Sequence, residues 1–167
     1  MRPNSEAGTE PQFSEEQLKT MVEGFFQGAS VGAVCNVQQE QLEAGYALAY
    51  NLYTAGSYAD AETMFRALCL YDHNDERYWM GLAGCRQALG QHAAAIDAYG
   101  MAGMASALSD PTPFVHAGLC YMKLGDKENA RATFAGVEVM GDPANEAHAV
   151  MHRKAKAMLD LLAGEDA

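Results

Sequence analysis

The sequence has few basic residues. It carries 11 Lys and Arg against 22 Asp and Glu, which gives a formal net charge of −11 over 167 residues. Nucleic acids and anionic lipid surfaces are bound by clustered Lys and Arg. The charge balance therefore argues against a nucleic-acid partner and against direct binding to a membrane surface. We interpret the negative charge as a source of solubility.

Long apolar runs are also lacking. The first residues, M-R-P-N-S-E-A-G-T-E-P-Q, contain no apolar signal core, and no later run approaches the length of a transmembrane helix. The cysteines form no C-x-x-C pair and have no zinc-ligand spacing; they are Cys35, Cys69, Cys85 and Cys120. We interpret them as mostly buried thiols in a reducing compartment, and expect a cytoplasmic protein.

Signatures of catalysis are missing as well. The chain contains no G-x-S-x-G, no P-loop and no H-E-x-x-H. His148 and His152 stand four residues apart on a predicted helix and could share a metal ion, but the sequence places no acidic or thiol ligand beside them. We favour exposed histidines, and expect no enzyme, no metal site and no cofactor.

The stretch 75–103 organises the rest of the chain. Its apolar, small and glycine positions have the spacing of a tetratricopeptide helix pair. Trp79 and Leu82 lie one turn apart and point into the pair. Gly90 ends the first helix, because glycine adopts the left-handed cap conformation without strain. Ala95 and Tyr99 mark the inward face of the second helix.

The same pattern occurs in two flanking copies, one tetratricopeptide period of about 34 residues away on each side. The matching positions are Gly56, Ala61 and Phe65 upstream, and Gly125, Ala130 and Phe134 downstream. Three unrelated helical hairpins would not share this spacing from glycine to alanine to aromatic residue. We therefore predict three repeats.

These patterns predict one all-α domain over residues 13–162, a tetratricopeptide-repeat superhelix with an added helix at each end. The expected units are an N-terminal helical segment at 13–41, repeats at 42–75, 76–109 and 111–144, and a capping helix at 145–162. The capping helix would cover the open end of the stack. We expect a disordered tail at 1–12 and a solvated tail at 163–167.

The predicted N-terminal helix lies outside the repeat register. A capping-box pattern, Ser14 with Gln17, precedes it. Its apolar stripe consists of Leu18, Met21, Val22, Phe25 and Phe26. Large apolar side chains gain free energy when they are buried, so either the first repeat or a second subunit must cover this stripe. The residues alone leave both alternatives open.

The first helices of stacked repeats line a concave surface. In the first repeat a stripe of tyrosines, Tyr46, Tyr50 and Tyr53, would face this groove, unless the rings are partly in the core. The corresponding positions are Met80, Gly84 and Gln87 in the second repeat, and Val115, Leu119 and Met122 in the third. A groove that is aromatic at one end and aliphatic at the other suits an extended apolar peptide.

Two further residues border the predicted groove. His73, in the loop between the first two repeats, either edges the groove or caps backbone groups of its loop. Arg77 is the nearest basic residue. A generic tetratricopeptide scaffold that clamps a peptide carboxylate needs Lys, Arg and Asn in its groove. The tyrosine and aliphatic lining favours a different ligand.

Three strings carry a resemblance to a known family. They are Y-x-L-A-Y-N-L-Y-x-x-G-x-Y-x-D-A-E from Tyr46, F-R-A-L-C-L-Y-D-H-N-D from Phe65 and M-G-L-A-G-C-R-Q-A-L-G-Q from Met80, and they follow an amphipathic helix that ends in a glycine-rich step. With these strings the chain resembles the class II chaperones of bacterial type III secretion, which hold translocator proteins, over residues 14–140.

The resemblance implies a function and a set of contacts. It implies that the groove, including the three tyrosines, holds a short extended segment, rich in proline and leucine, from near the N-terminus of a pore-forming translocator. The chaperone would keep that partner soluble and apart from its co-translocator before export. The resemblance also favours a homodimer through the N-terminal helix. The alternative function is a generic tetratricopeptide scaffold that binds another peptide.

Overall fold

The protein is described by a computed structural model over residues 14–142 and 144–164. Within these residues the chain forms nine helices and no strand. The predicted all-α class is confirmed. The predicted N-terminal tail lies outside the described residues. Ala163 and Gly164, which we assigned to the C-terminal tail, instead form the end of the last helix.

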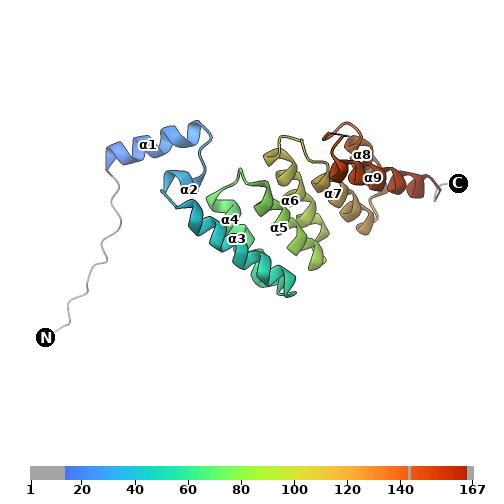
Figure 1. Cartoon of the computed structure of the whole chain (residues 1–167), viewed down its shortest axis with the longest axis horizontal. Helices are drawn as coiled ribbons and strands as arrows, with labels where there is room; N and C mark the ends of the chain where they lie inside the picture. Colours follow the sequence, from blue (N-terminus) through green and yellow to red (C-terminus); the bar gives the residue numbers. More distant parts are fainter. Residues whose placement is uncertain (1–13, 143, 165–167) are drawn as a thin grey trace.

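Three antiparallel helix pairs form the body of the molecule. They are α3 (Gln39–Thr54) with α4 (Tyr58–Tyr71), α5 (Glu76–Ala88) with α6 (His92–Ala105), and α7 (Thr112–Lys123) with α8 (Lys127–Val137). Each helix packs against the next one in the chain, so that the pairs stand in a row (Figure 1). α9 (Glu146–Gly164) packs on α8 and α7 at one end of the row.

The turn inside each pair has the same construction. Gly56, Gly90 and Gly125 have φ angles of +82°, +75° and +76°. A β-carbon at any of the three would have no other atom within 4 Å. The left-handed backbone conformation, and not a lack of space, therefore selects glycine here. This confirms that Gly90 ends the first helix of its pair.

The core follows the alanine and aromatic positions of the second helices. Each helix pair buries one such alanine and one such ring: Ala61 and Phe65, Ala95 and Tyr99, Ala130 and Phe134. Small side chains let the helices approach, and the rings fill the space between pairs. The repeat pattern in the sequence did not identify Tyr78 as a core residue, but its side chain is fully buried. Its neighbour Trp79 is only partly buried and donates an indole hydrogen bond to the His73 carbonyl oxygen at 2.9 Å.

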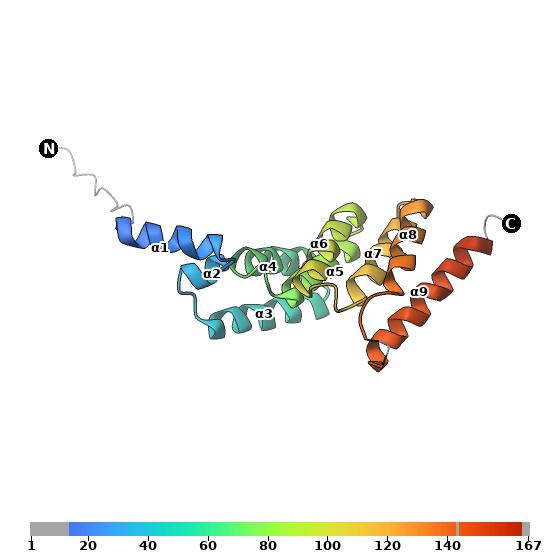
Figure 2. The ribbon, with the colours of Figure 1, turned by 90° about the horizontal axis from the view of Figure 1, so that it is seen from above.

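The N-terminal helix α1 (Glu15–Phe26) packs against the short α2 (Val31–Val34) and projects away from the helix pairs (Figure 2). Its apolar side chains are poorly covered: Val22 is 51% exposed and Phe26 is 90% exposed. In the single chain, α1 therefore does not bury these two side chains on the first helix pair. The side chains of Leu18 and Phe25 lie outside the described residues.

Candidate peptide-binding groove

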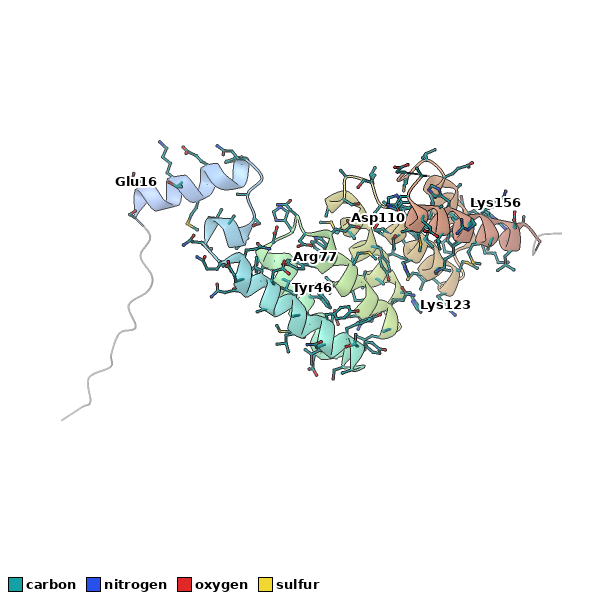
Figure 3. All side chains as sticks on the ribbon, in the orientation of Figure 1. Glu16, Tyr46, Arg77, Asp110, Lys123 and Lys156 are labelled. Carbon is teal, nitrogen blue, oxygen red and sulfur yellow. The ribbon has the colours of Figure 1, made fainter. Side chains whose placement is uncertain are left out.

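A hollow of about 480 Å³ opens on the side of the molecule that the first helices of the pairs share. Six of the residues predicted to line the groove surround it: Tyr46, Tyr50, Tyr53, Arg77, Met80 and Gly84. They come from α3 and α5, which lie next to each other in the row (Figure 3). The central part of the predicted site is thus brought together by the fold.

The tyrosines of α3 differ in their surroundings. Tyr46 stacks on Tyr50 at 6.3 Å between ring centroids, and it also contacts two core rings, Phe65 at 6.1 Å and Tyr78 at 5.9 Å. Tyr46 and Tyr53 pack against the core and are partly buried. Tyr50 is 53% exposed. The alternative of partial core burial therefore holds for Tyr46 and Tyr53, whereas Tyr50 presents its ring to the hollow.

Glycines on α5 give the hollow its depth. A β-carbon at Gly84 would lie 3.4 Å from the Tyr53 hydroxyl, and a β-carbon at Gly81 would overlap the Phe65 ring. Because these two positions carry no side chain, the rings from α3 and α4 reach the wall of the hollow. An open, ring-lined surface of this kind offers apolar contact area at low cost in side-chain entropy.

Arg77 is already engaged by its neighbours. Its guanidinium donates to Glu43 Oε1 and to Asp75 Oδ2, both at 2.6 Å. The group also lies 4.9 Å from the centroid of the Tyr46 ring, in a cation–π contact (Figure 3). The hydrogen bond from Arg77 lowers the pKa of the Glu43 carboxyl. Arg77 therefore holds the tyrosine in place and is poorly available to clamp a peptide carboxylate.

Part of the lining was not predicted. The additional residues are Phe65, Glu76, Gly81, Tyr99, Asp110 and His116. Phe65 and Tyr99 belong to the aromatic repeat position, which we had assigned to the core alone. Glu76 and Asp110 stand one repeat period apart, at the starts of successive first helices, and this spacing was a signal available in the sequence.

These additional residues make one wall of the hollow polar. Burial and the neighbouring Asp110 carboxyl raise the pKa of Glu76 to about 7. The His116 ring stacks on Tyr99 at 5.4 Å, and burial lowers the pKa of this imidazole. Asp110 Oδ1 accepts a hydrogen bond from the Thr112 backbone N–H at 2.8 Å. The groove thus combines aromatic contact area with two carboxyl groups.

The assignment of Val115 to the groove is wrong. Val115 is 0% exposed and packs in the core with Phe134 and Val137. The next residue, His116, faces the hollow in its place. The prediction carried the register of α5 over to α7. However, α7 is packed between α6, α8 and α9, and these neighbours place position 115 inside.

The remaining predicted residues lie outside the main hollow. Gln87, Leu119 and Met122 line a second hollow with His92 and Lys123, with a volume of about 510 Å³. Gln87 is linked to the main hollow, because the Tyr99 hydroxyl donates to Gln87 Oε1 at 2.6 Å. His73 is exposed in its loop and does not line either hollow.

Neither a grouping of metal ligands nor a membrane-spanning helix accompanies the groove in the described part of the chain. There, no three His, Cys, Asp or Glu residues are grouped as a metal ion would require. His148 Nδ1 accepts from the Asp142 backbone N–H at 3.0 Å, and His152 Nε2 lies 2.8 Å from the Met140 carbonyl oxygen, so both are used by the turn before α9. None of the described helices has the length and apolarity needed to cross a bilayer.

The chain was compared with known proteins. No model of a protein family matches it. It is 35% identical over 129 residues to the low calcium response locus protein H of Yersinia pestis, with 76% of each chain covered. Among solved structures, it is similar to the type III secretion chaperone SycD of Yersinia enterocolitica in complex with a peptide of the translocator YopD. The TM-score is 0.71 at 30% identity, with 78% of this chain and 98% of that chain covered.

A second solved structure gives the same result. PcrH, crystallised in complex with the chaperone-binding region of PopD, has a TM-score of 0.70 at 34% identity and covers 78% of this chain and 97% of its own. The tetratricopeptide-type architecture predicted from the repeat is confirmed by these likenesses. Identity and coverage at this level show common descent. The chain therefore belongs to the family of type III secretion translocator chaperones.

Proposed function

We propose that this protein is a cytoplasmic chaperone that holds an extended N-terminal segment of one or more translocators in its groove before secretion. The hollow between α3 and α5 is the observation that carries this proposal. It is open, ring-lined and built on rigid helices, which suits an extended peptide with apolar anchor side chains. The relatives SycD and PcrH are seen with peptides or regions of YopD and PopD, which supports the same mode of binding.

The proposed role is binding, without catalysis. A pore-forming protein exposes apolar surface before it reaches a membrane, and such surface aggregates in water. A chaperone that occupies an anchor segment lowers the concentration of the free, aggregating form by mass action. The acidic surface of this chain, with its net charge of −11, helps to keep the complex in solution.

We also propose that the free protein forms a homodimer through α1. The stripe that would form the contact is Leu18, Met21, Val22, Phe25 and Phe26. Phe26 and Val22, the most exposed of the described members, support this proposal, because exposed apolar side chains on a projecting helix invite a partner. SycD has been crystallised as an alternative dimer, which adds support by analogy.

Co-expression with a translocator tests the function. We expect the translocator to accumulate in the soluble fraction and to co-purify with this chain, and to aggregate when expressed alone. Tyr50→Ala should weaken the retention, while Glu128→Gln, on the exposed first turn of α8, should not. A translocator that is equally soluble with and without this chain would contradict the proposal.

A further inference from the structure

The groove carries two carboxyl groups that a purely apolar ligand would leave unused. Glu76 begins α5 and Asp110 lies in the loop before α7, and both line the hollow. The nearby Asp110 carboxyl contributes, after burial, to raising the pKa of the Glu76 carboxyl, so the two groups influence each other across the hollow. Two carboxylates at the wall of an apolar hollow repel each other unless a proton or a cation lies between them.

The described part of the chain supplies no cation to this pair. Lys19 is paired with Glu23, Arg77 with Glu43 and Asp75, and Arg86 with Glu62, and neither Glu76 nor Asp110 takes part in these pairs. Arg77 is next to Glu76 in sequence, but its guanidinium is already hydrogen-bonded to Glu43 and Asp75. His116 lines the same hollow, but burial favours its neutral form. The pair is therefore open to a positive charge from outside the chain.

The rest of the hollow fits the stem of a long basic side chain. Tyr46, Met80 and the Phe65 ring form apolar walls beside the two carboxyl groups. Lys and Arg side chains lay their methylene stems along apolar surface and place the charged head on polar groups. We propose that Glu76 and Asp110 receive a Lys or Arg side chain of the segment bound in the groove, and that this contact sets the register of the segment.

This inference rests on the proposed function, because it takes the groove as the place where the segment binds. It adds a requirement for the ligand: one basic residue at a fixed position among apolar anchors. The overall charge agrees with such a ligand, since a chain of net charge −11 attracts basic segments over distance.

A basic side chain beside Glu76 favours the ionised form of its carboxyl. The pKa of Glu76 is raised to about 7 by burial, by Asp110 and by Asp75. The other charged or titratable groups near the pair are Arg77 on α5 and His116 on α7, and Lys154 of α9 contributes to lowering the His116 pKa. Above its pKa the Glu76 carboxyl is ionised. The preference for a basic side chain should therefore increase with pH.

Matched peptides test this proposal. The probes are fluorescent peptides of the PopD chaperone-binding region that carry lysine or norleucine at one position at a time, since norleucine has the lysine stem without the ammonium group. Fluorescence anisotropy measures their affinities. We expect one position at which lysine binds about tenfold more tightly than norleucine at pH of about 8, as for a hydrogen bond to a charged group. The preference should shrink at pH of about 6.

The variant that removes the preference is Glu76→Gln with Asp110→Asn. Both changes keep the size of the side chains, and the asparagine retains an oxygen for the Thr112 N–H. Glu128→Gln is the control, and it should keep the full preference. Circular dichroism shows that each variant is folded.

The possible results separate the two proposals. Equal binding of lysine and norleucine at every position would overturn the role of the carboxyl pair and leave the groove function intact. A lysine preference that persists in the variant Glu76→Gln with Asp110→Asn would also overturn the role of the carboxyl pair and leave the groove function intact. If no peptide of the set binds, the proposed function fails, and the inference fails with it.

Discussion

The ring of Phe65 lies directly against the backbone of Gly81. A β-carbon at position 81 would overlap the Cε1 and Cζ atoms of the ring. Phe65 comes from α4 and Gly81 from α5, so this contact joins two helix pairs. The ring fills the floor of the hollow only because position 81 has no side chain. One glycine therefore links the packing of the core to the shape of the groove.

Gly81→Ala tests this contact. Alanine is better than glycine inside a helix by about 1 kcal/mol, but overpacking typically costs about 1–3 kcal/mol. We expect a net loss of stability in urea unfolding. Gly100→Ala in α6 is the matched control, because a β-carbon there meets nothing within 4 Å, and it should stabilise the protein. An equal gain for both variants would show that Phe65 does not press on position 81.

Tyr50→Ala should separate binding from folding. The ring is 53% exposed and contacts Tyr46, so its removal should change the melting temperature little. If Tyr50 is an anchor of the groove, binding of the PopD region should weaken by about 2 kcal/mol, which calorimetry would detect. Tyr46→Ala should lower both stability and affinity, because this ring also packs on Phe65 and Tyr78. Unchanged affinity in Tyr50→Ala would remove this residue from the site.

Glu76 should make the stability of the free protein depend on pH. Its folded-state pKa is raised from 4.5 to about 7, so folding favours the protonated form. Its contribution is fully favourable below about pH 4.5 and is lost as the pH rises through about 7. Glu76→Gln mimics the protonated form. The variant should therefore melt at the same temperature as the parent at low pH and a few degrees higher at pH of about 8. For chains of this size, a change of about 1 kcal/mol in stability shifts the melting temperature by about 2–4 °C. A difference in melting temperature between variant and parent that does not change with pH would contradict the raised pKa of Glu76.

Phe26→Asp tests the proposed dimer. Phe26 is 90% exposed in the single chain, and burial of a phenylalanine is worth roughly 1.5–3 kcal/mol. We expect sedimentation equilibrium to show a concentration-dependent dimer for the parent and a folded monomer for the variant. Thr20→Asp, at an exposed position on the same helix, controls for the added charge and should still dimerise. A parent that stays monomeric at high concentration would rule out this contact.

The sequence predicts features that depend on local backbone requirements better than those that depend on packing. Gly56, Gly90 and Gly125 could be placed from the period alone, because each turn needs a left-handed residue at the same step. Val115 could not be placed correctly. Whether position 115 or 116 faces the hollow depends on the rotation of α7 about its own axis. The packing of α7 against α6, α8 and α9 sets this rotation, and the local sequence pattern does not predict it.

The carboxyl pair shows a different kind of limit. Glu76 and Asp110 are one period apart, so the sequence brings them to equivalent places in successive repeats. However, acidic residues at helix starts are ordinary, since they interact favourably with the helix dipole. Only the packed structure shows that both residues line one hollow.

Site-specific photocrosslinking tests the central claim most directly. The photoreactive amino acid benzoylphenylalanine would replace Tyr50 in the hollow or, as control, Met104, which is 62% exposed on α6 outside it. Each protein would be irradiated with the PopD chaperone-binding region, and mass spectrometry would locate the crosslinks. The account predicts crosslinks from position 50, confined to one short segment of the partner, and none from position 104. Crosslinks from position 104 with none from position 50 would contradict it.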